Sequence, residues 1–172
     1  MGFVETTDAL ASRRNVRKYE DRPIPAADLD EILDAARRSP SSRNTQPWDF
    51  VVVTERAHLE RLATVWRGAG HVASSAATVA FIAPREPAEG MRIEYDLGQA
   101  TMCLMLAAAD LGVGTAHAAV GDQELARELL GFPEDRYCAY LIALGYPADG
   151  PLRPVRKLDR RAFDDVVHRE RW

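Results

Sequence analysis

The sequence predicts one domain of the α+β class spanning residues 1–172. Apolar runs typical of strands and amphipathic helical patterns are mixed along the chain with few strict strand-helix alternations, which disfavours a doubly wound parallel sheet. A length of 172 residues, of which 47% are hydrophobic and 28% charged, is typical of one globular domain with a full hydrophobic core. Neither an internal repeat nor a second domain is apparent in the sequence.

The first half of the chain predicts helices that alternate with two strands. A short helix begins at the capping residues 6–8 and continues to about Arg14, and a second helix begins near Pro25 and ends at Pro40. In the second helix, apolar residues at the spacing i, i+3, i+4 and i+7 form one buried face. The remaining predictions are a valine-rich strand at 49–54, a helix at 55–65, a loop or short helix at 67–77 and a strand at 78–83.

The second half predicts the core helix of the domain. Residues 92–111 form the longest helical pattern, which is apolar on most sides in its second half, so we expect the sheet to pack on this helix. Residues 115–120 have small side chains and predict a short strand or an extended turn. A helix at 123–130 follows the capping residue Asp122 and ends at Gly131, and residues 137–144 predict a further strand.

Residues 39–48 join the second helix to the first strand and are rich in uncharged polar side chains. Hydroxyl and amide groups at close spacing suit the edge of a flat heteroaromatic ligand, because they match alternating ring donors and acceptors. Pro40 and Pro47 hold the backbone extended, which lowers the entropy lost when a ligand binds. The alternative is an ordinary helix-to-strand loop, since Ser, Asn and Pro are common in turns.

Four basic residues, Arg13, Arg14, Arg17 and Lys18, lie within six positions of a chain whose formal net charge is −4. An acidic chain lacks the broad basic surface that binds nucleic acid, so we expect no nucleic-acid partner. The local cluster instead suits one bound anion. The alternative is helix termination, because cations favour the last turn of a helix.

The sequence also disfavours several other classes of protein. No stretch approaches the roughly 18 unbroken apolar residues of a membrane span, and the start shows no secretory signal, so we expect a cytoplasmic protein without a membrane partner. Cys103, Cys138 and the four histidines show no metal-ligand spacing, so we expect buried, reduced thiols and no metal site. A third glycine at dinucleotide spacing, a P-loop and a serine-hydrolase elbow are not found.

Six motifs occur in the order that they have in one enzyme family. They are residues 13–19 (RRNVRKY), 40–48 (PSSRNTQPW), 106–115 (LAAADLGVGT), 129–133 (LLGFP), 144–147 (LGYP) and 160–168 (RRAFDDVVH). Together they resemble the nitroreductase family over nearly the whole chain, with Asn15 in place of the family's Ser. One motif alone would be weak, but six in order are specific.

The resemblance implies a nitroreductase-like fold, with a central mixed or antiparallel sheet surrounded by helices. It also implies a homodimer in which each C-terminal tail is exchanged with the partner subunit. The tail at 162–172 carries Phe163, Val166, Val167 and Trp172, which are too apolar for a free segment. The alternative is a short solvated helix on its own subunit.

The resemblance further implies an FMN site shared between two subunits. The arginines near the start would hold the phosphate together with Arg160, or with Arg156 as the alternative, and the loop at 40–46 would reach the FMN of the partner subunit. Small side chains at 118–119 would let backbone amides approach the flavin ring. Trp48 is expected in the core, whereas His117 is either a buried histidine or a substrate contact. The implied FMN-binding residues are Arg13, Arg14, Asn15, Arg17, Pro40, Ser41, Ser42, Asn44, Gln46, Ala118, Ala119 and Arg160.

By the same resemblance, the chain would be an FMN-dependent oxidoreductase with a ping-pong mechanism. NAD(P)H would reduce the flavin and leave, after which a nitroaromatic, quinone or related small-molecule acceptor would be reduced. No side chain need be catalytic, because the flavin carries the chemistry. Two alternatives stay open: a flavin-binding storage protein with little turnover, and an oxidase or dehydrogenase of one metabolite. Residues 67–90 leave little room for inserted helices over the substrate, so the acceptor and the nicotinamide preference stay open.

Overall fold

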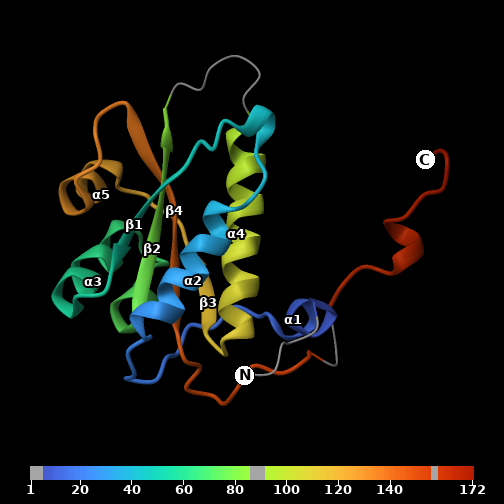
Figure 1. The fold of residues 1–172 in the computed structure, drawn as a ribbon, viewed down its shortest axis with the longest axis horizontal. Coiled ribbons are helices and arrows are strands. Elements are labelled where there is room, and N and C mark those ends of the chain that lie inside the picture. The colour runs from blue at the N-terminus through green and yellow to red at the C-terminus, as the bar shows by residue number, and fades with distance from the viewer. Residues whose placement is uncertain (1–5, 86–91, 156–158) are drawn as a thin grey trace.

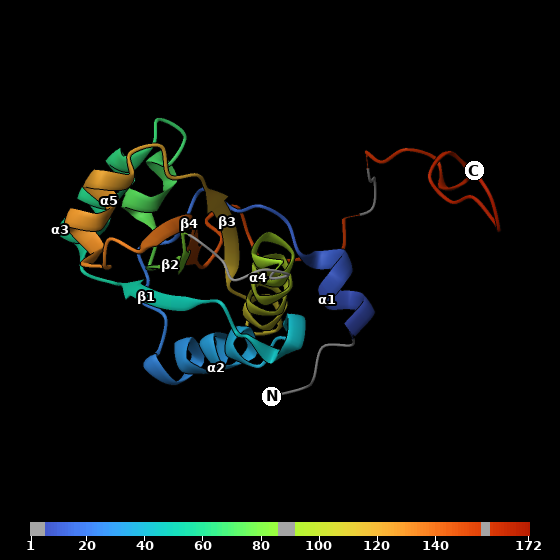
Figure 2. The same ribbon diagram turned by 90° about the horizontal axis from the view of Figure 1, so that it is seen from above.

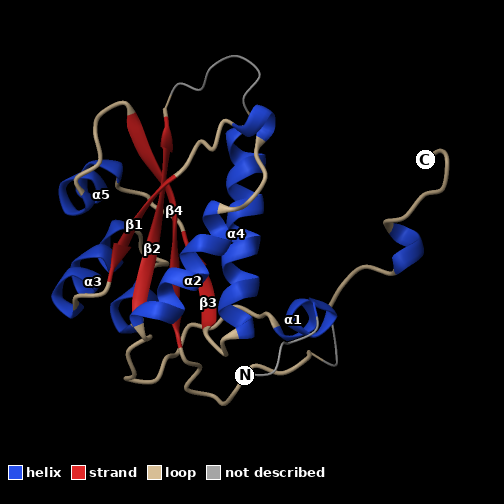
Figure 3. Ribbon diagram, viewed as in Figure 1, coloured by secondary structure: helices blue, strands red, loops and turns tan. Residues whose placement is uncertain are grey.

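The computed structural model describes residues 6–85, 92–155 and 159–172 and has the predicted α+β fold (Figures 1 and 3). The strands are β1 (Asp49–Val53), β2 (Ala77–Pro84), β3 (Gly114–Ala118) and β4 (Arg136–Gly145). The α-helices are α1 (Thr6–Ser12), α2 (Ala26–Arg37), α3 (Arg56–Leu62), α4 (Ile93–Asp110) and α5 (Gln123–Leu130). Short 3₁₀ turns lie at Ser42–Asn44, Ala63–Val65, Gly70–Ser74 and Phe163–Asp165.

The four strands form one antiparallel sheet in the order β1-β2-β4-β3. β2 and β4 are the central strands, and their pairing shifts by a bulge between Phe81 and Ile82. β2 is buried over nearly its whole length, as expected for a strand that is covered on both faces. β3 lies at one edge of the sheet, which leaves one side of its backbone available to other groups.

The sheet separates two helical layers (Figure 2). α2 and α4 cover one face, where Phe81, Leu97 and Ile142 belong to the same buried cluster. α3 and α5 cover the other face, where Leu59 and Leu141 are fully buried. Trp48 is 8% exposed and belongs to the α2 and α4 core, so its predicted core position is confirmed.

Most predicted elements are present with ends that differ by one or two residues. α4 is the longest helix and packs on the sheet, as its apolar pattern predicted. α5 has both predicted caps, because the Asp122 side chain accepts a hydrogen bond from Leu125 N and Gly131 is left-handed with φ of 72°. Cys138 is buried, which raises the pKa of its thiol to about 12, whereas Cys103 is only half-buried.

The C-terminal residues 159–172 run away from the domain (Figure 1). All of them are exposed, and their only helical turn is the 3₁₀ segment Phe163–Asp165. Phe163 is 64% exposed and Trp172 99% exposed, so the apolar side chains of this tail are not buried on their own subunit. The alternative phosphate contact, Arg156, lies outside the described residues.

Candidate active site

The arginine cluster follows α1 as extended chain beside the edge strand β3. α1 ends at Ser12 with no basic residue in its last turn, and Arg13 follows it directly with its N–H bonded to Ala9 O, so helix termination does not account for Arg17 or Lys18. Val16 N donates a hydrogen bond of 2.9 Å to Thr115 O, and Asn15 forms a parallel bridge with Thr115. The exposed residues Asn15 and Arg17 therefore lie beside the first half of β3.

The second half of β3 is an open edge beyond this short pairing. The carbonyl of Thr115 points outward to Val16, and backbone groups alternate in direction along a strand, so the N–H and C=O of His117 also point outward. Ala119, which follows the strand, is exposed. Outward backbone donors beside small side chains can approach a flat ligand closely.

The arginines differ in the partners that they already have. Arg14 pairs with Asp149 at 2.5 Å and is the member of the cluster whose charge is already compensated. No carboxylate pairs with Arg13 or Arg17 among the described residues. Two guanidinium groups without a paired carboxylate at one end of β3 favour an anion, and a phosphate group suits their paired donors.

Two histidines flank this end of β3 on opposite faces of the sheet. His117 faces the α4 side, where partial desolvation of its ring by the surrounding side chains and the charges of Arg13 and Arg17 lower its pKa, although the residue keeps an exposed part. His71 is buried in the 3₁₀ turn on the other side of the sheet. Burial and the charge of Arg17 lower the pKa of His71, and they outweigh a hydrogen bond with the backbone of Ala116 that favours the protonated ring. Both rings are therefore neutral at pH 7, and the arginines carry the local positive charge.

A cavity of about 190 Å³ lies beside β3 and α4, and its lining includes Arg13, Met105, His117 and Tyr140. The Tyr140 hydroxyl is 2.6 Å from Thr101 Oγ1 and donates to Leu97 O at 2.9 Å, and burial raises its pKa to about 12. The tyrosine is therefore a fixed, neutral wall of the cavity. His117 is itself exposed, so the buried-histidine alternative is wrong, and its position suits the ligand-contact alternative.

The predicted binding loop, residues 40–46, is locally strained. Arg43, Asn44 and Gln46 have φ values of 54°, 57° and 47°, which is the left-handed region that residues other than glycine seldom adopt. Each such residue costs about 1 kcal/mol or more, so surrounding contacts must hold the loop in place. Strain of this kind clusters at binding sites, and it disfavours the ordinary-loop alternative.

A buried carboxylate supplies the main contact that holds this loop. Asp96 of α4 is fully buried and accepts hydrogen bonds from Ser42 N at 3.0 Å and from Ser42 Oγ at 3.2 Å. Within the loop, Ser41 Oγ accepts from Gln46 N, and Gln46 Nε2 donates to Asn44 O. Pro40, Asn44 and Gln46 are exposed, so the loop presents polar groups away from its own domain.

The arginine end and the loop lie at different positions along α4. The loop is joined to α4 at Asp96, whereas Arg13 reaches Met105, with Nη1 3.9 Å from its sulfur. These positions are nine residues apart, which is about 13 Å along a helix axis. Tyr95 and Met102 lie seven residues apart on the same side of α4 and form an exposed apolar stripe, in which Tyr95 is 66% and Met102 40% exposed.

The remaining predicted residues are not gathered at one place in a single subunit. The Ala118 side chain is buried in the core beneath α3 and α5, so only Ala119 is exposed at the edge. Arg160 lies in the extended tail, and its Nη1 donates to Asp159 O. The sequence-based interpretation missed Asp96, His71 and Tyr140. The signal for Asp96 was a carboxylate on the apolar side of the core helix.

Over residues 6–85, 92–155 and 159–172, His, Cys, Asp and Glu side chains form no group able to hold a metal ion. Within these same ranges, no helix combines the length and the apolar character needed to cross a membrane.

Comparisons with known proteins agree with this geometry. Residues 10–91 match the model of the nitroreductase family. A protein of Archaeoglobus fulgidus named as an NADH dehydrogenase/NAD(P)H nitroreductase is 33% identical over 98% of this chain and 99% of its own length. The Bacillus subtilis FMN reductase [NAD(P)H] is 23% identical over 98% of this chain and 74% of its own length. The structure of an FMN-dependent nitroreductase from Clostridium difficile has a TM-score of 0.85, with 24% identity over 95% of this chain and 98% of that one.

Proposed function

The chain belongs to the nitroreductase family and is an NAD(P)H-dependent flavin oxidoreductase, and on this premise we propose that it works as a homodimer with two shared FMN sites. The separation of the arginine end from the loop at 40–46 along α4 carries the proposal. In one subunit the loop is attached to the first turn of α4 at Asp96 and presents its polar groups away from its own domain, whereas the arginine end meets the second half of α4 at Met105.

A twofold arrangement of two α4 helices would join them. If the exposed stripes of two antiparallel α4 helices pack together, the Asp96 end of one helix lies beside the Met105 end of the other. The loop of one subunit then reaches the arginines of its partner. Burial of Tyr95 and Met102 in such an interface would also stabilise the dimer, because both are large apolar side chains on the surface.

The donors present fit FMN. Arg13 and Arg17 suit its single terminal phosphate, and the exposed edge of β3 suits its flat ring. Asn15, Ser41, Ser42, Asn44 and Gln46 would supply hydrogen bonds to the ribityl chain and the ring edge, and Arg160 of an exchanged tail would add a phosphate contact. When bound, FMN would accept a hydride equivalent from NAD(P)H and deliver it to an acceptor.

The side chains around this site would position and stabilise, and none would act as a nucleophile. The outward amide of His117 would donate to the ring, and Tyr140 would fix the cavity wall. The loop at 40–46 would exclude water from the shared site. A nitroaromatic or quinone acceptor would then occupy the place that the nicotinamide has left, which is the ping-pong order.

The identity of the cofactor can be tested by release. We expect the purified protein to be yellow and to release FMN on heating, identified by chromatography, at two per dimer. The chain has no glycine-rich pyrophosphate turn, which argues against FAD. Recovery of FAD, or of no flavin after incubation with FMN, would overturn the assignment.

The dimer can be tested with one charged substitution. Met102→Glu places a carboxylate in the exposed α4 stripe, and we expect monomers that retain little FMN, measured by light scattering and absorbance. Ala57→Glu, on the exposed side of α3, is the control and should remain a dimer. Flavin-bound Met102→Glu dimers would contradict the proposed interface.

Turnover can be tested by anaerobic stopped-flow reduction of the FMN-bound protein. We expect NADH or NADPH to reduce the flavin rapidly and a nitroaromatic or quinone to reoxidise it. Uniformly slow reduction by both donors would instead favour flavin storage, and rapid reduction by a metabolite alone would favour a dedicated dehydrogenase.

A further inference from the structure

Trp66 lies in a cradle made by two glycines. A Cβ atom at Gly121 would lie 2.4 Å from Trp66 Cε3, and one at Gly68 would lie 2.8 Å from Nε1. Real Cβ atoms do not come so close to a ring, so this indole can take its place only because both positions are glycine. The ring is nevertheless 38% exposed, so the fold fixes an indole that it does not bury.

This cradle adjoins the open edge of β3. Val65 O accepts hydrogen bonds from Gly121 N at 3.0 Å and from Asp122 N at 2.9 Å, which attaches the Trp66 segment to the turn after β3. Gly121 is two residues beyond Ala119, about 7 Å along extended chain. His71, five residues after Trp66, lies near both Ala116 of β3 and Arg17. Trp66 therefore borders the proposed flavin edge on the face opposite α4.

Arg67 places a cation over this indole. Its guanidinium carbon is 5.3 Å from the centre of the Trp66 ring, and Arg67 is exposed. In the described ranges of the chain, no carboxylate forms an ion pair with Arg67. By contrast, Arg61 of α3, Arg127 of α5 and Arg136 of β4 each have one. An aromatic face and a guanidinium without a paired carboxylate thus occur together beside the site.

We propose that Trp66 and Arg67 form the acceptor subsite and favour aromatic acceptors that carry a carboxylate. This inference rests on the proposed function, because it places the acceptor beside a bound flavin. The indole supplies a flat apolar wall for the acceptor ring, and the guanidinium forms a paired contact with the carboxylate. Selectivity then comes from Arg67, and general affinity for aromatic rings comes from Trp66.

The test compares two probes of the same shape on the FMN-bound protein. 4-Nitrobenzoate carries the carboxylate and 4-nitrobenzamide does not. We expect a higher kcat/KM for the benzoate in the wild type, and Arg67→Gln should lower this preference on the order of tenfold, which corresponds to about 1.4 kcal/mol. Trp66→Leu should lower kcat/KM for both probes by similar factors. Dissociation constants on the oxidised protein, from flavin difference spectra, should change in the same way.

Arg22→Gln is the matched control, because Arg22 also stacks on an aromatic ring, 3.7 Å over Tyr146, but in another part of the fold. It should leave the preference unchanged. The proposal would be overturned if Arg67→Gln kept the wild-type preference for 4-nitrobenzoate over 4-nitrobenzamide. It would also be overturned if the substitution changed only the KM for NADPH, because Arg67 would then bind the phosphate of the electron donor. Loss of flavin binding or of flavin reduction by NAD(P)H in the wild type would instead refute the proposed function. If the wild type binds FMN but is not reduced by NAD(P)H, the dissociation constants of the two probes still test the subsite separately from the proposed function.

Discussion

Removing the Asp96 carboxylate should release the loop at 40–46 from α4. Asp96→Ala deletes the acceptor for Ser42 N at 3.0 Å and for Ser42 Oγ at 3.2 Å, at a fully buried position. A hydrogen bond to a charged group is worth about 1.5 to 3 kcal/mol. Taking the lower value for each of the two bonds, their loss should lower the free energy of unfolding by about 3 kcal/mol. For a chain of this size, that corresponds to a fall in Tm of roughly 6 to 12 °C.

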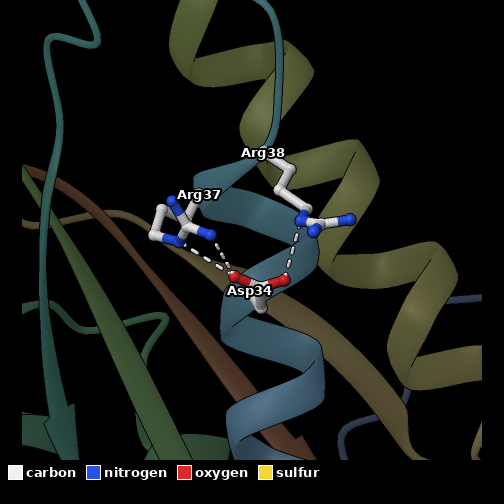
Figure 4. Close-up of polar contacts among 3 residues, drawn as sticks. All are labelled: Asp34, Arg37 and Arg38. Atoms are coloured by element: carbon white, nitrogen blue, oxygen red, sulfur yellow. Dashed lines mark hydrogen bonds and ion pairs between the residues drawn. The ribbon is translucent and has the colours of Figure 1, made fainter.

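Asp34→Ala is the matched control, because Asp34 is also a helical aspartate with hydrogen-bonded partners. Its carboxylate contacts Arg37 and Arg38 one turn further along α2 (Figure 4), but its side chain is 46% exposed. Such surface pairs contribute little, so Asp34→Ala should leave stability nearly unchanged. Urea unfolding followed by circular dichroism gives both values. Equal losses for the two variants would refute the argument that the buried carboxylate anchors the loop.

Four further predictions concern charged groups and the tail. Arg17→Ala should weaken FMN binding about tenfold or more but leave riboflavin binding nearly unchanged, measured by flavin fluorescence, because only FMN has a phosphate; equal losses would assign Arg17 another role. Arg14→Ala should have the smaller effect, since Asp149 already pairs with Arg14. Deletion from Ala162 onward should yield monomers or aggregates without flavin, and a folded, flavin-bound dimer would contradict the exchanged tail. Partial desolvation of the ring and the charges of Arg13 and Arg17 lower the pKa of His117 in the folded chain. The unfolded chain therefore protonates this imidazole at a higher pH than the folded chain does, so the free energy of unfolding should fall as the pH drops below about 6.5. In His117→Gln, the free energy of unfolding, measured by urea titrations at several pH values, should fall less steeply with decreasing pH. An unchanged pH dependence would show that His117 is not its cause.

The local elements could be read from the sequence because their signals are local. The Asp122 cap and Gly131 fixed both ends of α5, and the apolar pattern of residues 92–111 identified the core helix. The family motifs also identified the fold and the enzyme class. These features depend on spacing along the chain, which a sequence contains directly.

The arrangement of the site depends on contacts between distant residues and could not be predicted in the same way. Nothing in the spacing shows that β4 inserts between β2 and β3, or that Ser42 meets Asp96, 54 residues later. Side chains alternate along β3, so Ala118 points into the core beneath α3 and α5 and His117 points to the α4 side. A shift of one residue in the strand register would have reversed the two. The contact of Trp66 with Gly121 likewise appears only when the turn after β3 folds back.

The rigid length of α4 between Asp96 and Met105 has a consequence for how this chain can vary. In the proposed dimer, this length sets the distance between the loop that a subunit contributes to its partner's site and the arginines of its own site. One residue inserted there would rotate one end by about 100° relative to the other and lengthen the helix by about 1.5 Å, which would misalign both sites at once. Insertions in the connection before α4, or after β4, would leave that distance unchanged. Relatives should therefore differ in length at these connections and keep a constant number of residues between the positions of Asp96 and Met105.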